Sequence, residues 1–385
     1  MSDLKTQIAE AYKRDQERGF RPVARADELP NSFDEITDEW LTATLCGAVA
    51  GAKVVGHQLG PVDDGSSNRR RMTVRYNAAG EDAKLPEKLF CKASHALQNR
   101  MVLGISGGAF SEVEFYKSVR PLLAIEAPVG YFASLDPVSF NSMIMLGDIT
   151  DDVTEFCNHH TKMPRARVES QLRLLAEMHG KGYSDPKVIK EISKFETWPD
   201  YFNCTLAFGM KEGSEQGFIM AESVVPPAVY LRQKEIWPAT MASIDMHRKL
   251  PITFGHGDVH LKNWYVAGNG EMGLGDWQCA HRGHWSRDFA YTVSVGLPTE
   301  DRRAWEVDLL KFYLDRMQAA GGPAVAFDDA WTYYRQQLMT ALTWWTITLN
   351  PTPTIPDMQP KDITLEFVRR ITTAMDDLKT LDSFS

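Results

Sequence analysis

The sequence has few of the features that mark a secreted or membrane protein. Its 385 residues include five cysteines, an odd number, and no two of them form a Cys-x-x-Cys pair. This scatter excludes a disulfide framework and the usual kind of zinc site, and it favours reduced thiols. The first residues are charged throughout and lack the apolar stretch of a secretion signal. No apolar run approaches the roughly 18 residues of a spanning helix, so we expect a cytoplasmic protein outside the membrane.

Positive charge is also scarce. Lys and Arg number 42 against 51 Asp and Glu, which gives a formal net charge of −9. This balance argues against nucleic acid and an anionic membrane surface as partners, and it is compatible with a cationic ligand. Hydrophobic residues at 43% and charged residues at 24% form an ordinary globular mixture, which excludes disordered and fibrous classes. The length predicts two or three domain-sized units.

The first part of the chain is predicted to be a helical extension and an antiparallel sheet. Residues 1–50 read as a polar helical arm, a Pro-containing loop and a short helix opened by Thr37. One helix is expected near 109–123, after the third strand, and the sheet domain covers 51–149. The expected strands are 52–59, 69–77, 88–94, 129–134 and 139–149.

Helical patterns dominate the second part, 150–385. A loop and a hairpin of two short strands, at 254–278, interrupt them. The expected helices are 165–183, 227–249, 285–296, 300–320, 328–348 and 363–381. The fold class predicted is therefore α+β, with a small sheet part and a large helical part.

The strongest chemical signal is HGDVHLKN at 256–263, followed by GDW at 275–277. A carboxylate five residues before an Asn is the spacing of a kinase catalytic loop. In such a loop the Asp orients or deprotonates an attacking hydroxyl, and the Asn carbonyl reaches a magnesium ion. Asp276, on the far arm of the hairpin, is placed to bind the same metal. Hard oxygen ligands of this kind suit Mg²⁺.

HGDVHLKN resembles the HGDxHxxN motif of the aminoglycoside phosphotransferase and choline kinase-like family, including its ecdysteroid-kinase-like branches. The resemblance implies a bilobal protein kinase-like fold, with a small antiparallel-sheet N-lobe and a large, mainly helical C-lobe. It implies Asp258 as the catalytic base and His256 as an organiser of the loop. It implies Asn263 and Asp276 as metal ligands, and Asp288 resembles the DLA residue that braces the catalytic loop.

The reaction implied is direct in-line transfer of the γ-phosphoryl group from ATP or GTP to a hydroxyl of a small molecule, with Mg²⁺. Lys92, in the third strand, corresponds to the kinase lysine that contacts the α and β phosphates. Its partner should be a Glu on the next helix, where Glu112 and Glu114 are both available. The family resemblance aligns Glu112 with the family's glutamate. Glu114 lies about 200° round the helix from Glu112, on the opposite side, so we expect Glu112 to be the partner of Lys92.

Gly65, Ser66, Ser67 and Asn68 are candidates for the loop that covers the phosphates. Glycine and small hydroxyl residues let backbone N–H groups approach phosphate, although the same residues also fit a plain hairpin turn. The three arginines of 69–71 alternate in direction, and we expect solvated strand residues there.

Met145, Leu146 and Gly147 close the last strand of the sheet domain. In the family this crossover is the hinge whose backbone groups bind adenine, and a linker without a ligand is the alternative. We interpret His281 and His284 as structural, because no third metal ligand lies nearby in the sequence.

Two other functions compete with this one. GISGG at 104–108 matches the GxSxG nucleophile elbow, but no histidine follows His284 to complete a hydrolase triad. We therefore interpret GISGG as a flexible loop before the helix of Glu112. The second alternative is a catalytically inactive kinase-like protein that binds a nucleotide or ligand, and the full set of expected residues argues against it.

The acceptor is the most open question. Aromatic residues at 198–202 and 331–345 suit either an amphipathic alcohol or plain helix packing. Acidic residues at 148–155 suit an aminoglycoside, but they equally suit a helix start. The sequence is also compatible with a macrolide, a steroid, a sugar or choline as the acceptor. It does not distinguish ATP from GTP as the donor, and it does not predict the oligomeric state.

Overall fold

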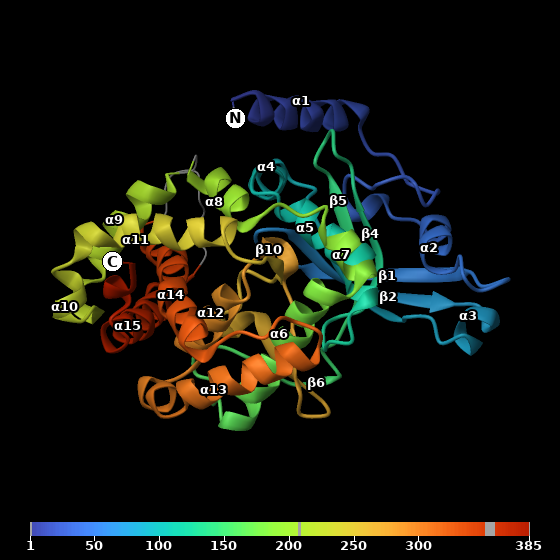
Figure 1. Ribbon diagram of the computed structural model, residues 1–385. Helices are drawn as coiled ribbons and strands as arrows, with labels where there is room; N and C mark the ends of the chain where they lie inside the picture. Colours follow the sequence, from blue (N-terminus) through green and yellow to red (C-terminus); the bar gives the residue numbers. More distant parts are fainter. Residues whose placement is uncertain (1, 207–208, 351–358, 385) are drawn as a thin grey trace. The chain divides into compact units, whose positions relative to one another are not determined.

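The structure is a computed structural model, and it describes residues 2–206, 209–350 and 359–384. The chain divides into two compact units, each with its own core (Figure 1). The sheet unit comprises Met1–Leu122, Ala127–Asp152 and Trp277–Cys279. The helical unit comprises Leu123–Glu126, Val153–Asp276 and Ala280–Ser385. The first 50 residues thus fall within the sheet unit.

The sheet unit contains a five-stranded sheet of order β1-β2-β3-β5-β4, in which every neighbouring pair is antiparallel. Its strands are β1 (Val54–Val62), β2 (Asn68–Tyr76), β3 (Lys88–Ala93), β4 (Gly130–Leu135) and β5 (Ser142–Gly147). Alternate residues such as Leu89 and Cys91 of β3 face one core, as the pleat of a strand requires. The antiparallel sheet predicted from the sequence is therefore confirmed.

Short helices cover this sheet. Helix α2 (Asp38–Leu45) buries Trp40 and Leu41 in the sheet core. Thr37 caps it as expected, because its side chain accepts a hydrogen bond from the Trp40 backbone N–H. The long helix α1 (Ser2–Arg18) precedes it, and α3 (Ala78–Asp82) joins β2 to β3.

The prediction of one helix after β3 was wrong. Two helices follow, α4 (Leu97–Ile105) and α5 (Gly108–Glu114), and the second continues into a π-turn at Phe115–Val119. GISGG is accordingly no flexible loop, because its first two residues end α4 and its last begins α5. Helix α4 has no side-chain cap of its own at Ala96, so the sequence carries no start signal for it.

The main helices of the helical unit match the predicted ranges closely. They are α6 (Arg165–Ser184), α12 (Ser286–Gly296), α13 (Thr299–Ala319), α14 (Phe327–Leu349) and α15 (Lys361–Asp377). The helix expected at 227–249 is divided into α10 (Pro227–Tyr230) and α11 (Gln233–Asp245). Three further helices are α7 (Pro186–Ile192), α8 (Trp198–Leu206) and α9 (Met210–Met220).

Two small sheets complete the helical unit. Strands β8 (Trp264–Ala267) and β9 (Met272–Leu274) form the predicted hairpin. Strand β6 (Val153–Phe156) pairs with β8. The acidic stretch that also suited a helix start therefore forms a turn at Asp151 and Asp152 and continues into β6 at Glu155. Strands β7 (Thr253–Gly255) and β10 (His281–Gly283) pair with each other on either side of the hairpin in the sequence. The α+β class is confirmed.

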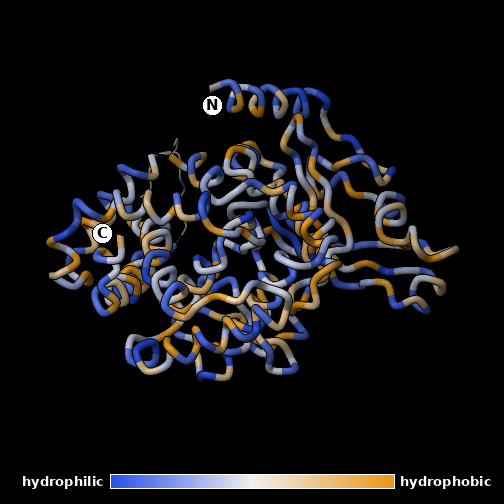
Figure 2. The backbone as a smooth tube through the Cα atoms, viewed as in Figure 1, coloured by the Kyte–Doolittle hydropathy of each residue, from blue (hydrophilic) through white to orange (hydrophobic). Residues whose placement is uncertain are grey.

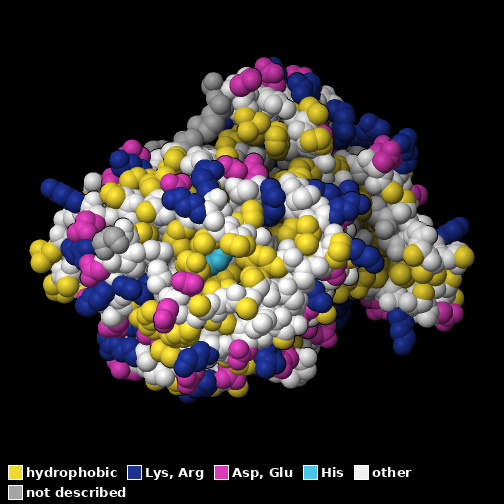
Figure 3. Space-filling view, in the orientation of Figure 1, with side chains coloured by type: hydrophobic (Ala, Val, Ile, Leu, Met, Phe, Trp, Pro, Cys, Tyr) yellow, Lys and Arg dark blue, Asp and Glu magenta, His cyan; other side chains and the backbone are white. Residues whose placement is uncertain are grey.

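The surface and the thiols are ordinary. On the face shown in Figure 3, Lys and Arg side chains are interspersed with Asp and Glu. All five cysteines are free. Over the part of the chain that the structure describes, no helix combines the length and apolar character needed to cross a membrane.

The crossing of α9 and α14 depends on Gly217. A Cβ atom on this residue would lie 1.8 Å from the Thr346 carbonyl oxygen, so the two helices would have to separate. We expect Gly217→Ala to destabilise the helical unit by about 1–3 kcal/mol, measured by urea unfolding. Gly296→Ala is the matched control, since its Cβ would meet only Leu261 at 3.7 Å. Equal midpoints for the two variants would contradict the prediction.

Candidate active site

The HGDVHLKN segment forms a loop between β7 and β8. Asp288 of α12 holds the backbone of this loop. Its Oδ2 accepts the His256 backbone N–H at 2.7 Å, and its Oδ1 accepts the Gly257 backbone N–H at 3.0 Å. Gly257 has φ +85, a conformation that glycine adopts without strain. The turn leading into Asp258 is therefore fixed by one side chain from a neighbouring helix.

The Asp288 carboxylate is a charged acceptor although it is only 2% exposed. Burial by itself raises the pKa of this group, but His179 and the Arg287 guanidinium lower it by more. The net pKa lies well below the ordinary value for Asp. His179 Nε2 is 3.3 Å from Oδ2. Hydrogen bonds to an ionised acceptor are stronger than neutral ones, so the loop is held firmly.

His256 links the HGDVHLKN loop to the β8–β9 hairpin. The Asp258 backbone N–H donates to its Nδ1 at 3.2 Å, so the proton is on Nε2, which donates to the Gly275 carbonyl at 2.9 Å. Burial is the largest influence on the pKa of His256 and lowers it, which favours this neutral form. His256 thus fixes the chain immediately before Asp276.

Three side chains surround the Asp258 carboxylate. Tyr291 donates its hydroxyl to Oδ1 at 3.0 Å. Asn263 Nδ2 lies 3.3 Å from Oδ2, and His260 Nε2 lies 3.4 Å from the same oxygen. Burial raises the pKa of Asp258, but the electrostatic influence of the neighbouring His260 and the hydrogen bond from Tyr291 lower it below its usual value. The side chain is 23% exposed, so an ionised oxygen acceptor remains accessible.

Sequence reasoning missed Tyr291 and His260 as partners of Asp258. Tyr291 lies three residues after Asp288 on α12, and this spacing puts both on one helix face. His260 occupies a fixed position of the HGDxHxxN motif. Both signals were present in the sequence.

Asn263 and Asp276 lie at the two ends of the β8–β9 hairpin. The Gly275 backbone N–H donates to the Asn263 carbonyl at 2.9 Å, and Trp264 is paired with Leu274. Asn263 Nδ2 donates to the Asp258 carbonyl at 2.8 Å, which leaves its Oδ1 as the group for a ligand. Asp276 is exposed and has φ +59, a conformation that non-glycine residues adopt mainly at functional sites and in turns.

These two donors fit Mg²⁺. One carboxylate and one carboxamide oxygen are hard ligands, and Mg²⁺ takes few protein ligands because it keeps water and substrate phosphates. In the described ranges, no group of three His, Cys, Asp or Glu residues is arranged to hold a metal ion by itself.

In the sheet unit, Lys92 of β3 pairs with Glu112 of α5. The Lys92 Nζ to Glu112 Oε1 distance is 2.5 Å, and the side chains are 9% and 4% exposed. The other Glu112 oxygen accepts the Gln278 Nε2 group at 3.3 Å, a contact that sequence reasoning did not anticipate. Glu114 instead accepts a hydrogen bond from Ser118 at 2.6 Å. The structure therefore gives Lys92 the partner that the family resemblance aligned.

The Gly65–Asn68 loop is held by α4. Asn99 Nδ2 donates to the carbonyls of both Gly65 and Ser66 at 2.8 Å. Asn68 Oδ1 accepts the backbone N–H groups of His95 and Ala96 at 2.9 Å each. Of the four predicted loop residues, Asn68 and Ser67 are buried and Ser66 is exposed, so the Asn68 side chain is structural.

The arginines after this loop are engaged with neighbouring groups. Arg69 contacts Asp63, and Arg71 contacts Asp148 and Thr150.

The predicted hinge residues lie in β5. Met145 and Leu146 are buried there, and the Gly147 backbone N–H donates to the Val129 carbonyl at 2.9 Å.

The histidines after the hairpin are buried. His284 Nδ1 is 2.7 Å from the Ser286 hydroxyl, and its backbone N–H donates to His247 at 2.8 Å. His281 is 2% exposed and packs against Trp198, with the ring centroids 4.8 Å apart. These contacts are those of structural residues.

Comparison with known proteins supports the resemblance seen in the motif. Residues 164–327, somewhat less than half of the chain, match the family model of the phosphotransferase enzyme family (APH). The matched range contains the whole HGDVHLKN loop, the hairpin and Asp288, and it lies outside the sheet unit except at 277–279. No curated protein matches the chain.

Solved structures with some likeness to this one cover most of the chain. A candidate aminoglycoside phosphotransferase from Ralstonia eutropha has 14% identity and a TM-score of 0.47, over 89% of this chain and 97% of its own. Choline kinase LicA from Streptococcus pneumoniae has 10% identity and a TM-score of 0.46, over 84% of this chain and 94% of its own. An ethanolamine kinase from Plasmodium vivax has 9% identity and a TM-score of 0.46, over 83% of this chain and 81% of its own. Identities and scores this low carry no argument about activity.

Replacing the loop-holding carboxylate should destabilise the helical unit. Asp288→Asn keeps the size and shape of the side chain but replaces one carboxylate oxygen by an NH₂ group. This donor then faces one of the two backbone N–H groups, which loses its acceptor. We expect a loss of about 1.5–3 kcal/mol at pH 7 in urea unfolding, the usual cost of a charged hydrogen bond. Asp329→Asn, the same change at an exposed position of α14, should cost far less. Similar losses in both variants would show that Asp288 does not hold the loop.

Proposed function

We propose, from the match of residues 164–327 to the family model of the phosphotransferase enzyme family, that the protein transfers the γ-phosphoryl group of ATP or GTP to a hydroxyl of a small molecule. The observation that carries the proposal is the environment of Asp258. It is an ionised, accessible carboxylate within the matched range, and three neighbouring side chains orient it.

Asp258 acts as the base. One carboxylate oxygen accepts a hydrogen bond from the acceptor hydroxyl and takes its proton as the hydroxyl oxygen attacks the γ-phosphorus in line. The bond from that phosphorus to the leaving nucleoside diphosphate breaks in the same step. Tyr291 and Asn263 keep the carboxylate oriented, which matters because this transfer depends on positioning. No phospho-enzyme is formed.

Asn263, through Oδ1, and the Asp276 carboxylate would hold Mg²⁺. When bound there, Mg²⁺ neutralises charge on the phosphate oxygens. His256 keeps the two ligands in register, because it connects the loop that contains Asn263 to the residue before Asp276. The left-handed backbone of Asp276 is then a conformation that the metal site requires.

Lys92 contacts the α and β phosphates. Its ammonium group is held by Glu112, and Gln278 orients the Glu112 carboxylate. Backbone N–H groups of the Gly65–Asn68 loop cover the phosphates. The Met145–Gly147 segment binds adenine through backbone groups other than the Gly147 N–H, which already donates to Val129.

The acceptor is a small-molecule alcohol of undetermined class. Among the aromatic residues considered for its pocket, Trp198, Phe202 and Tyr334 are fully buried and serve as core. Trp344 is half-buried and stacks with Phe202, so it is a better candidate for a pocket wall. A panel of acceptors should therefore span several chemistries.

The test is an acceptor screen with γ-labelled ATP and GTP, over aminoglycosides, macrolides, sterols, sugars and choline. We expect label transfer to one class. Asp258→Asn should lower that transfer by about 10²–10⁴-fold, the usual contribution of a general base, while Mg·nucleotide binding stays within about twofold. Asp329→Asn is the control for an exposed acid.

Two results would contradict parts of this proposal. Transfer to no acceptor, with Mg·nucleotide binding intact by calorimetry, would favour the inactive nucleotide-binding protein. Wild-type turnover in Asp258→Asn would remove Asp258 as the base.

The metal ligands give a separate prediction. Chelation with EDTA should stop transfer, and added Mg²⁺ should restore it. Asp276→Asn should raise the Mg²⁺ concentration for half-maximal rate by at least about tenfold, since even residues outside the direct ligands cost about 10–100-fold in metal affinity. Asp329→Asn should leave that concentration unchanged. An unaltered Mg²⁺ requirement in Asp276→Asn would exclude it as a ligand.

A further inference from the structure

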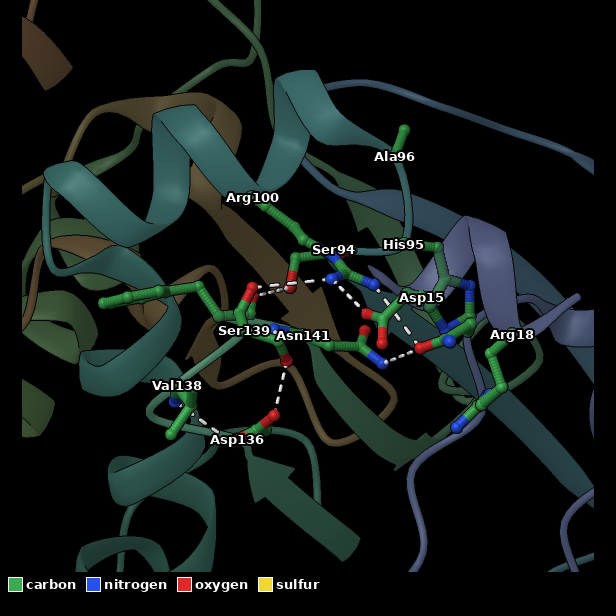
Figure 4. A network of polar contacts seen from close by, with 12 residues as sticks. Asp15, Arg18, Ser94, His95, Ala96, Arg100, Asp136, Val138, Ser139 and Asn141 are labelled. Atoms are coloured by element: carbon green, nitrogen blue, oxygen red, sulfur yellow. Dashed lines mark hydrogen bonds and ion pairs between the residues drawn. The ribbon is translucent and has the colours of Figure 1, made fainter. Parts of the chain in front are cut away.

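Arg100 of α4 is a buried cation whose carboxylate partner comes from the N-terminal helix. Its side chain is fully buried, and its NH1 group lies 2.5 Å from Asp15 Oδ2 (Figure 4). Its Nε donates to the Ser94 carbonyl at 3.1 Å, just before α4 begins. Its NH2 group lies 3.4 Å from Asn31 Oδ1. Arg100 therefore joins α1, the loop after α1 and the first turn of α4.

Apolar and aromatic side chains also join α1 to α4. Figure 2 shows α1 as largely hydrophilic, with a few hydrophobic positions, and Ile8 and Ala11 are the buried ones. A Cβ on Gly104 would lie 3.2 Å from Ile8 Cδ1, so the two helices touch there. The ring of Tyr12 lies 5.3 Å from the Arg100 guanidinium. The ion pair differs from these contacts because loss of Asp15 would leave the buried Arg100 charge without its carboxylate.

The same turn of α4 also holds the Gly65–Asn68 loop. Asn99, next to Arg100 in the chain, donates to the Gly65 and Ser66 carbonyls at 2.8 Å. In return, Asn68 accepts the backbone N–H groups of His95 and Ala96. The first turn of α4 thus touches the N-terminal helix through one residue and the loop through the next.

We propose that α1 sets the position of the Gly65–Asn68 loop through α4. Asp15 fixes Arg100, Arg100 fixes the first turn of α4, and Asn99 in that turn fixes the loop. Asp15 and Asn99 are positioning residues for nucleotide binding, and the N-terminal helix is part of the nucleotide-binding apparatus. The link to nucleotide rests on the proposed function, whereas the link between Asp15 and the loop stands by itself.

The first test is Asp15→Asn in the full chain, with Glu17→Gln as the matched control on the exposed face of the same helix. Asp15→Asn leaves the Arg100 charge without its carboxylate. We expect amide hydrogen exchange in a peptide covering residues 60–70 to become about 5- to 30-fold faster. This factor corresponds to a decrease of about 1–2 kcal/mol in the free energy of local opening. Glu17→Gln should exchange like the wild type.

The second readout is kinetic. Asp15→Asn should raise the KM for nucleotide by about 5- to 30-fold and change kcat by less than about twofold, because the loop contributes to binding and not to the chemical step. Asn99→Ala should give the same pattern. The double variant should be no worse than Asn99→Ala alone, since both changes act on one connection.

The outcomes separate the two proposals. Loop exchange and KM in Asp15→Asn equal to those of Glu17→Gln would overturn the coupling. Additive effects in the double variant would overturn the route through Asn99. Absence of any phosphoryl transfer in the wild type would remove the proposed function, and the exchange measurement would still decide the coupling. If Asp15→Asn does not fold, Asp15→Leu with Arg100→Met removes both charges together and takes its place.

Discussion

The HGDVHLKN loop, which contains the proposed base, depends on one buried carboxylate, that of Asp288. It accepts the backbone N–H groups of His256 and Gly257, and it stays ionised because His179 and Arg287 outweigh the effect of burial. Every residue of α12, which contains Asp288, is buried, so the helix is a rigid support. Tyr291 of the same helix donates to Asp258. One helix therefore positions both the backbone and the carboxylate of the proposed base.

The hairpin shows the complementary constraint. Its two ends bring the backbones of Asn263 and Gly275 into contact because the β8–β9 register pairs Trp264 with Leu274. Asp276 follows in a left-handed conformation, which costs free energy for any residue with a Cβ. The neutral ring of His256 offsets part of that cost by holding the preceding carbonyl. Rigid support and local strain thus occur together, as they do at sites that must be arranged before the substrate binds.

What the sequence predicted follows from how local each signal is. The long helices and the β8–β9 hairpin have strong periodicity or turn residues, and they were found within a few residues. Thr37 was identified as a cap because its partner, Trp40, lies one turn away. Helix α4 was missed because the two residues before it, His95 and Ala96, are held by the Asn68 side chain, which is far away in the sequence. Asn68 was assigned to phosphate from the composition of its loop, which does not show that its side chain is already engaged. Gln278 was missed because only the folded chain brings it to Glu112, whereas Tyr291 could have been found from its spacing to Asp288 on one helix face.

The buried charges point to a common purpose. Lys92 with Glu112 and Arg100 with Asp15 are ion pairs of low exposure within the sheet unit. Such pairs add little to stability, because desolvation consumes most of the Coulombic gain and apolar residues of the same volume often do as well. Such pairs instead fix the orientation of the groups that they join, since a buried charged pair tolerates few geometries. One pair orients the ammonium proposed to meet phosphate, and the other orients the helix turn that holds the loop. The net charge of −9 says nothing of this, because what matters at these positions is which charges are buried together.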